Sequence, residues 1–327
     1  MIQRVNVKDL TNIELVSIRD GFGNGFLTLG EKHRDVIGMS ADLTESLRMH
    51  HFAERYPDRF FQVGITEQNM AGMAAGLALS GKIPYIGTFA NFSPGRNYDQ
   101  IRISICMMNA NVKIISSHSG FSYGEDGMSV QMNEDIAMMR ALPNMKIVVP
   151  ADAVQAAKAT EAIAYEEGPV YLRLGREKTP VLFDEQEKFE LGKVQLLREG
   201  TDVTIFANGY MLFRALIAAD KLAQQNISAQ VVNVHTVKPL DENAVIELVQ
   251  QTGAVVTAEE AQIYGGLGGA IAEVLAKHLP TPLDMVAVKD VFGESGTSLE
   301  LHQSRGLMDD DIVSAAVNVF TRKHNNR

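Results

Sequence analysis

The segment 64–70 (GITEQNM) contains the carboxylate with the clearest chemical potential in this sequence. Glu67 falls where a predicted strand gives way to a predicted helix, and helix N-termini stabilise negative charge. A carboxylate held there can bind a ligand, or it can be a first-turn glutamate that completes a capping arrangement. Small residues at positions 71, 72, 74, 75, 76 and 78 would let this helix pack closely against another surface.

Two aromatic residues and a polar loop follow two further predicted strands. Phe89 and Phe92 lie three residues apart in segment 87–92 (GTFANF), so they could face one ligand ring or belong to the core. The loop 118–127 (HSGFSYGEDG) is dense in Gly, Ser and acidic residues. Open α/β sheets bind ligands in loops at the carboxyl ends of strands, although Asp126-Gly127 also suits a plain surface turn. Several arginines also lie near these segments, although most surface arginines are solvated and bind nothing: Arg19, Arg48, Arg96, Arg173 and Arg176.

Alternating strand and helix patterns must position these residues. Apolar, β-branched strands that alternate with helices indicate an α/β fold with a mostly parallel sheet covered on both faces. The predicted strands of the first half are 35–39, 60–63, 83–88, 112–116, 146–149 and 170–174. The predicted helices are 11–33, 67–79, 98–108, 134–141 and 153–166.

A second, smaller α/β domain is predicted after a charged and weakly patterned segment. We expect the first domain at residues 1–180, a linker at 181–192 and the second domain at 193–327, with each domain able to fold alone. The predicted strands of the second domain are 202–207, 229–234 and 254–257, and its helices are 211–224, 241–251, 269–278 and 309–321.

Composition narrows the functional class. Apolar residues make up 46% of the 327 residues, which is ordinary for a globular protein. The net charge of -10 argues against a nucleic-acid partner. Cys106 is the single cysteine, so no intrachain disulfide can form, and its apolar surroundings favour a buried thiol. No window reaches the roughly 18 apolar residues of a membrane span, and the start lacks an apolar signal core, so we expect a cytoplasmic protein.

Many segments, in register along nearly the whole chain, resemble the transketolase family. The matching segments are 40–44 (SADLT), 64–70, 87–92, 118–127, 142–144 (LPN), 150–152 (PAD), 237–241 (VKPLD), 259–260 (EE), 265–268 (GGLG) and 292–296 (FGESG). The resemblance implies a pyrimidine-binding domain for thiamine diphosphate, followed by a smaller transketolase C-terminal-like domain. It also implies a transferase that moves a two-carbon ketol unit from a ketose to an aldose.

The resemblance assigns five residues to the cofactor. Glu67 matches the family glutamate that hydrogen-bonds N1′ of the aminopyrimidine and thereby activates the cofactor. Phe89 and Phe92 would pack on the pyrimidine. Asp42 and Leu43 would lie near the cofactor, and Leu43 would help to hold its bent shape.

On the substrate side, the resemblance implies a grip on a terminal anionic group. Arg19, Ser46, His118 and Arg176 match family positions that bind the terminal phosphate of the acceptor, and His118 is also a catalytic candidate. Arginine suits a planar, multi-oxygen anion. Asp126 matches the aspartate that contacts a sugar hydroxyl.

Two departures from the family pattern fall within the site. Val130 stands where a histidine usually contacts the substrate near the reacting carbonyl, so the pocket is either reshaped for an unusual sugar or inactive. We favour reshaping, because Glu67, His118 and Asp126 are all present. Gly95 replaces a tyrosine of the pyrimidine pocket, with Tyr98 close by.

The GDG motif that holds the metal and the diphosphate in full-length transketolases does not occur in this sequence. We therefore expect no metal ligands here, and Mg²⁺, which commonly bridges phosphates, would be held by a partner. The expected partner is a separate diphosphate-binding N-terminal subunit in an α2β2 heterotetramer.

Other readings remain open at the level of sequence. Beta subunits of 2-oxo-acid dehydrogenases share the two-domain layout, but the GEDG loop with His118 favours a transketolase. A 1-deoxyxylulose-5-phosphate-synthase-like activity is disfavoured, because those proteins carry all domains in one chain. A non-catalytic scaffold subunit is the remaining alternative.

Overall fold

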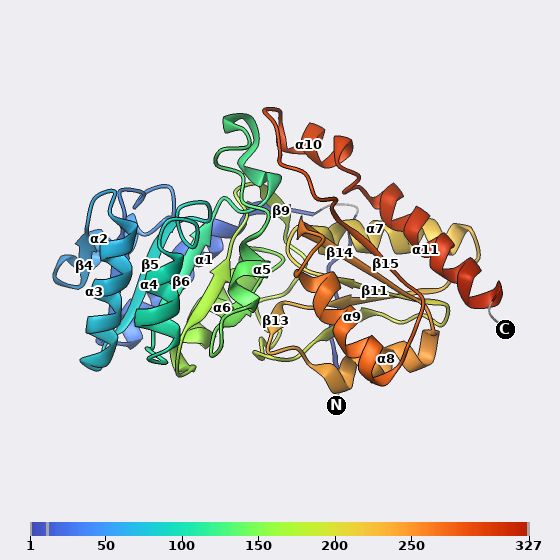
Figure 1. Cartoon of the computed structure of the whole chain (residues 1–327), viewed down its shortest axis with the longest axis horizontal. Helices are drawn as coiled ribbons and strands as arrows, with labels where there is room; N and C mark the ends of the chain where they lie inside the picture. The colour runs from blue at the N-terminus through green and yellow to red at the C-terminus, as the bar shows by residue number, and fades with distance from the viewer. Residues whose placement is uncertain (1, 11–12, 326–327) are drawn as a thin grey trace.

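Two mixed β-sheets, each covered by helices on both faces, organise the chain (Figure 1). The computed structural model describes residues 2–10 and 13–325. The first unit lies at the left of Figure 1 and the second at the right, with the loop after β6 rising between them beside α10 (Ser298–Ser304).

The first sheet has seven strands in the order β13-β7-β8-β6-β5-β3-β4. All neighbouring pairs are parallel except the one between β13 and β7, which confirms a mostly parallel sheet. The strands are β3 (Val36–Ser40), β4 (Phe60–Gln62), β5 (Ile83–Phe89), β6 (Lys113–Ser117), β7 (Lys146–Val148), β8 (Val170–Arg173) and β13 (Thr236–Lys238).

Alternating side chains divide this sheet between two cores. On β5, Tyr85 packs with one cluster and Ile86 with the other, as expected from the period of two along a strand. One face is covered by α1 (Ile18–Lys32), α2 (His50–Arg55) and α6 (Ala153–Ala162). The opposite face is covered by α3 (Glu67–Leu79), the π-helix η2 (Ile101–Cys106) and α5 (Asp135–Arg140).

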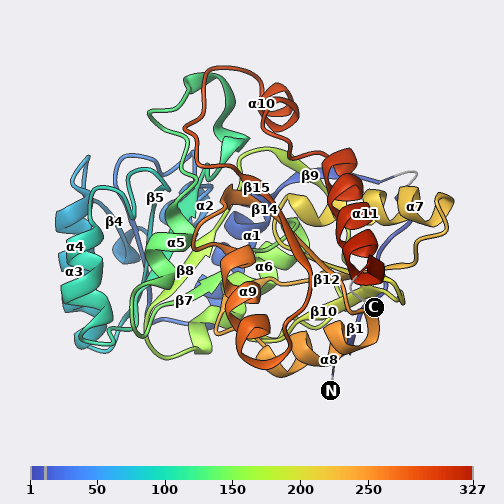
Figure 2. The ribbon, with the colours of Figure 1, turned by 45° about the vertical axis from the view of Figure 1, so that its right-hand side comes forward.

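The second sheet has six strands in the order β1-β10-β12-β11-β14-β15, and only β10 and β12 pair antiparallel. Its strands are β1 (Gln3–Arg4), β10 (Gln195–Arg198), β11 (Val203–Ala207), β12 (Ala229–Asn233), β14 (Val255–Gln262) and β15 (Leu283–Val288). Its helices are α7 (Met211–Gln224) and α11 (Asp309–Asn325) on one face, and α8 (Glu242–Thr252) and α9 (Leu267–His278) on the other (Figure 2).

Sheet membership does not follow the division expected at residue 180. Strand β1 belongs to the second sheet, where it pairs with β10, and β13 belongs to the first, where it pairs with β7. The segment 181–192 is also anchored at its start. Its residues Leu182 and Phe183 are buried, and their amides donate to Oδ2 of Asp152 at 2.7 and 2.9 Å.

Two predicted helices differ from the structure. The helix predicted at 11–33 begins at Ile18, because Ser17 has extended backbone and the strand β2 (Leu15–Ser17) pairs with β9 (Lys178–Pro180). Residues 11 and 12 lie outside the described part. The helix predicted at 98–108 is a short α4 (Tyr98–Gln100) that continues as the π-helix η2.

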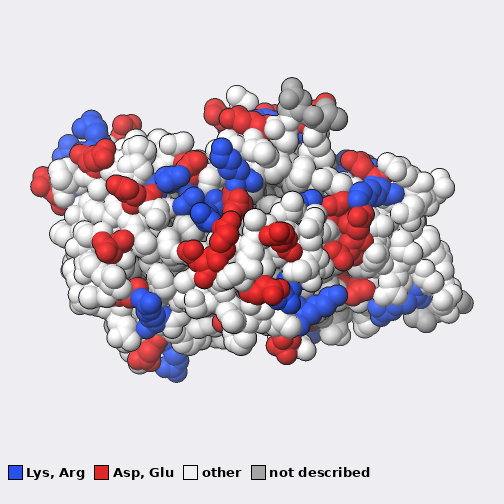
Figure 3. All heavy atoms as spheres, turned by 90° about the horizontal axis from the view of Figure 1, so that it is seen from above, with Lys and Arg blue, Asp and Glu red and all other residues white. Residues whose placement is uncertain are grey.

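Other features of the chain are simpler. Cys106 is buried, and its burial raises the pKa of the thiol to about 11. Within the described residues, the helices are too short or too polar to cross a membrane. Seen from above, Lys and Arg side chains lie among Asp and Glu side chains over the middle of the molecule (Figure 3).

Candidate functional site

The candidate site lies at the carboxyl edge of the first sheet. Strands β3, β5, β6 and β8 are neighbours and mutually parallel, so the loops that follow them meet at one edge. The sequence-predicted residues are carried by these loops, by the start of α1 and by the start of α3.

Glu67 is the first residue of α3, and its side chain is only 5% exposed. Its Oε1 accepts a hydrogen bond from a guanidinium nitrogen of Arg96 at 3.0 Å. Thr66 at the N-cap makes no capping hydrogen bond through its side chain. The Glu67 carboxylate is therefore a buried acceptor aimed at a neighbouring side chain.

Arg96 joins this carboxylate to the aromatic pair. Its guanidinium lies 4.1 Å from the ring centroid of Phe92, so one planar group both stacks on a ring and donates to Glu67. Phe92 in turn stacks with Phe89, with centroids 5.8 Å apart and planes inclined by 29°. Arg96 thus links the Glu67 carboxylate to the stacked pair of Phe92 and Phe89.

His118 continues the aromatic wall. Its ring centroid is 3.8 Å from that of Phe89, and the ring of Tyr123 lies nearly perpendicular to that of Phe89, with centroids 5.3 Å apart. Ser117 Oγ lies 2.6 Å from His118 Nδ1, and an Arg19 nitrogen lies 3.4 Å from Nε2. Because arginine can only donate, Nε2 faces it as an acceptor, and Nδ1–H donates to Ser117.

Burial and the neighbouring arginines keep this imidazole neutral. Desolvation is the main cause, with Arg19 and Arg176 next, and together they lower the pKa of His118 to about 2. His118 therefore contributes a neutral, oriented ring, and the positive charge at this end of the site comes from arginines.

Arginines gather at the end of the site beside His118, and we call this positively charged end the anion end. Arg19 donates to the backbone carbonyl of Ser46 at 2.7 Å, so it contacts the main chain of Ser46. The Arg19 Nε is buried without a hydrogen-bond partner, which leaves a donor for an anionic oxygen. Burial and the nearby charge of Arg48 lower the pKa of Arg19 to about 10, so it stays charged at neutral pH.

Arg176 and Asp126 belong to a connected loop. Arg176 donates to the carbonyl of Tyr123 at 3.1 Å and lies 3.7 Å from the carboxylate of Glu125. Burial and a hydrogen bond to Asp126 raise the pKa of Tyr123 to about 12. Val130 is partly buried against the same cluster that contains Phe89 and Tyr123.

The remaining predicted residues are less central. Leu43 is partly buried against the cluster of Phe89, whereas Asp42 is exposed and its amide donates to Gln62 Oε1 at 2.7 Å. The hydroxyl of Tyr98, which lies near Gly95 in the sequence, donates to the carbonyl of Met138 at 3.2 Å. Arg173 is buried, and its Nε donates to Oδ2 of buried Asp135 at 2.7 Å.

The sequence marked Arg96 only as one of several arginines near the candidate segments, and it did not single out Tyr123. Both signals were present, because Arg96 follows Phe92 by four residues and Tyr123 lies within the matched loop 118–127. Their contacts could not be predicted from the sequence, because the ring of Tyr123 meets Phe89 only when β5 and β6 pair.

The residues around Glu67 fit an aminopyrimidine. Arg96 shows that a planar group can stack on Phe92 and donate an N–H to Glu67 at once, which are the two contacts that ring would make. Among the residues that the structure describes, no group of three or more His, Cys, Asp or Glu side chains could hold a metal ion.

Comparisons with known proteins show the family of both units. Residues 14–181 match the family described as "Transketolase, pyrimidine binding domain", and residues 192–312 match "Transketolase, C-terminal domain". A solved structure titled "Split gene transketolase, inactive beta4 tetramer" superimposes with a TM-score of 0.89. It is 44% identical and covers 94% of this chain and 99% of that chain.

Two relatives are subunits of transketolases. The 6-deoxy-6-sulfo-D-fructose transketolase subunit SqwH of Clostridium sp. (strain MSTE9) is 42% identical over 94% of this chain and 95% of its own length. An apulose-4-phosphate transketolase subunit of Phocaeicola vulgatus is 32% identical over 94% of this chain and 99% of its own length. The chain belongs to the transketolase family and contains its pyrimidine-binding and C-terminal domains.

Proposed function

We propose that this chain is the C-terminal subunit of a split transketolase that transfers a two-carbon ketol unit from a ketose to an aldose. The observation that carries the proposal is the buried Glu67 carboxylate, which shares a planar donor with the face of Phe92. Thiamine diphosphate, when bound, supplies the electron sink for breaking and forming the carbon–carbon bond.

This chain would hold the pyrimidine end of that cofactor. Glu67 would accept a hydrogen bond from the ring and hold a proton there. Phe92 and Phe89 would orient the ring through stacking. Leu43, which packs beside Phe89, would support the cofactor from the side, and Asp42 would lie near it. Arg96 would have to leave the Glu67 carboxylate to admit the ring, and its 50% exposed side chain has room to do so.

The anion end would hold the terminal group of the sugar. Arg19 lies 3.4 Å from His118, the charge of Arg176 acts on both, and Arg19 Nε is a buried donor without a partner. Ser46 would add its hydroxyl. Asp126 would contact a sugar hydroxyl. Sulfonate and phosphate both present three oxygens, and the relatives include a sulfofructose and an apulose-phosphate enzyme, so both groups are candidates.

Val130 would select the sugar. Its side chain lies against the cluster of Phe89 and Tyr123, where a histidine would offer a polar group to the substrate. An apolar surface at this point suits a sugar that lacks, or displaces, the hydroxyl which that histidine would bind. We therefore propose a pocket reshaped for an atypical ketose.

A partner subunit would complete the site. The outer face of α3 is open, because a Cβ added at Gly72 or Gly76 would meet no atom of the described chain within 4 Å. Exposed Met73 and Leu79 lie on the same helix. We propose that a diphosphate-binding subunit packs here, brings the Mg²⁺ ligands and forms an α2β2 heterotetramer with this chain.

The test is reconstitution. This chain would be assayed alone and mixed with a diphosphate-domain subunit, using thiamine diphosphate, Mg²⁺, an aldose acceptor and a panel of phosphorylated and sulfonated ketoses. We expect turnover only in the mixture. Decarboxylation of a 2-oxo acid in place of ketol transfer would overturn the proposal. So would a stable complex that turns over no ketose.

A further inference from the structure

Two adjacent glutamates on β14 face different parts of the molecule. Glu259 and Glu260 are both buried, at 1% and 4% exposure. Glu259 accepts from the amides of Leu267 and Gly268 at 2.7 and 2.8 Å, so it caps α9 within its own unit. Glu260 instead reaches across to the first unit.

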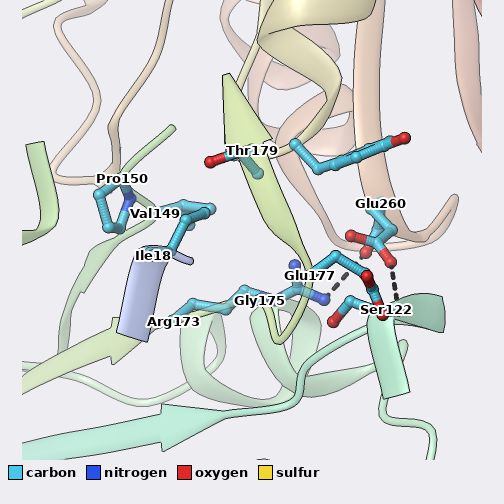
Figure 4. A pocket seen from close by; sticks show the side chains of 11 residues that line it. Ile18, Ser122, Val149, Pro150, Arg173, Gly175, Glu177, Thr179 and Glu260 are labelled. Carbon is cyan, nitrogen blue, oxygen red and sulfur yellow. Dashed lines mark hydrogen bonds between the residues drawn. The ribbon is translucent and has the colours of Figure 1, made fainter. Parts of the chain in front are cut away.

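Glu260 holds the loop that follows β6. Its Oε1 accepts from the backbone amide of Ser122 at 2.8 Å, and its carbonyl accepts from Arg173 at 2.9 Å (Figure 4). The imidazole Nε2 of buried His302 lies 3.3 Å from the same Oε1. A buried carboxylate is costly unless it has such partners, so this arrangement is a specific one.

Ser122 links Glu260 to Arg176. Its hydroxyl accepts from the amide of Arg176 at 3.0 Å and donates to the carbonyl of Ser119 at 2.6 Å. The same loop leaves no room between Glu260 and Gly120. Gly120 has a φ of +66°, and a Cβ added there would come within 2.6 Å of the Glu260 carboxylate.

A second tie fixes the far end of the loop. Gln131 donates through Nε2 to the carbonyl of Gly124 and to the carbonyl of Glu294, both at 2.9 Å. Figure 2 shows the segment that contains Glu294 running beside this loop next to α10. The 3₁₀ segment η3 (Phe121–Asp126), which carries Tyr123 and Asp126, is thus held by the second unit near both ends.

We infer that Glu260 is a positioning residue through which the C-terminal unit sets the substrate-binding loop and Arg176. It does so through the Ser122 amide, without touching the substrate. The effect expected on KM rests on the proposed function. The effect expected on the order of the loop 118–127 does not depend on that function.

The structural test is amide hydrogen exchange in the full chain. Glu260→Ala removes the acceptor of the Ser122 amide, and Glu259→Ala removes an equally buried carboxylate from the next position. We expect exchange in residues 118–127 to accelerate roughly 10-fold or more in Glu260→Ala, the factor expected when a charged hydrogen bond is lost. In Glu259→Ala the acceleration should be confined to the start of α9. Equal exchange of the loop in both variants would overturn the inference.

Glu260→Gln keeps an oxygen acceptor without the charge, and it serves if Glu260→Ala does not fold. We expect this variant to show a smaller acceleration of the loop, and loop exchange unchanged from the parent would contradict the inference. In the reconstituted enzyme, Glu260→Ala should raise the KM for a phosphorylated or sulfonated sugar roughly 10-fold and change kcat less. A lower kcat at unchanged KM would also overturn it. Failure of ketol transfer in the parent protein would sink the proposed function and leave the exchange result intact.

Discussion

At the anion end of the site, Arg19 and Arg176 donate to backbone carbonyls of their own chain. The loop 118–127 is held by a hydrogen bond from the Ser122 amide to Glu260 of the second unit. At the end around Glu67, which we propose holds the cofactor and call the cofactor end, Glu67 is buried. It lies on a helix where a Cβ added at Gly72 or Gly76 would meet no atom of the described chain within 4 Å. Its hydrogen-bond partner, Arg96, is half exposed.

The comparison distinguishes the part of the site that this chain orders by itself from the part that the proposed partner subunit would complete. Groups that are already oriented by hydrogen bonds lose little freedom when a ligand binds. The anion end meets that condition. The cofactor end is lined by this chain on one side only, and the proposed partner subunit would line the other side. Variants at the two ends should therefore fail in different ways.

The largest expected effect is at the cofactor end. Glu67→Ala should lower turnover of the reconstituted enzyme by at least about 100-fold, because a positioned proton-transfer group is lost. Complex formation, followed by size-exclusion chromatography, should not change. Gln68→Ala alters the exposed neighbour and should retain most of the rate. A Glu67→Ala rate within twofold of the parent would favour the scaffold reading.

At the anion end, the loss should appear in KM. Arg176→Lys keeps the charge but removes the forked donor geometry, so the KM for a phosphorylated or sulfonated sugar should rise roughly 10-fold. A matched exposed arginine on α11, changed as Arg322→Lys, should have no effect. If a sugar without the terminal anion is affected equally, Arg176 is not an anion ligand.

A smaller change should separate sugar selection from both ends. Val130→His should improve kcat/KM for an ordinary pentose phosphate by about 10-fold, since it adds one hydrogen-bonding group to the pocket. Val130→Ala controls for the change in size. Substrate preference that stays the same in both variants would argue against a reshaped pocket.

The smallest effect concerns pH. The pKa of His118 is lowered to about 2, so His118 has already lost its proton at pH 6 and has none to lose as pH rises. Arg19, with a pKa near 10, keeps its charge over the same range. Sulfate affinity of the full chain, measured by calorimetry, should change less than about twofold between pH 6 and 9. A fall in affinity through pH 6.5 that disappears in His118→Asn would show an ordinary, titrating histidine.

Elements with strong periodicity could be predicted from the sequence. The helices at 67–79 and 211–224 have the predicted bounds. Strand β15 was missed because Asp284 interrupts its apolar pattern near the edge of the sheet. Helix α10 was missed although Thr297 and Glu300 form a capping box, a signal that the sequence does contain.

Candidate members of the site could be named from the sequence, but their contacts could not. Glu67, Phe89, Phe92 and His118 stand in matched segments, and the structure places them along one wall. The link from Glu260 to Ser122 could not be predicted, because it spans 138 residues and forms only when the two units dock. Local pattern contains no information on such pairs.

The exchange of strands between the two sheets has a consequence for how the protein would respond to cleavage. Strand β1, at the start of the chain, completes the second sheet, and β13, from the second half, completes the first. A proteolytic cut within 184–192 would leave each fragment with one strand that pairs in the sheet of the other fragment. The nicked protein should therefore migrate as one particle under native conditions and separate only on unfolding.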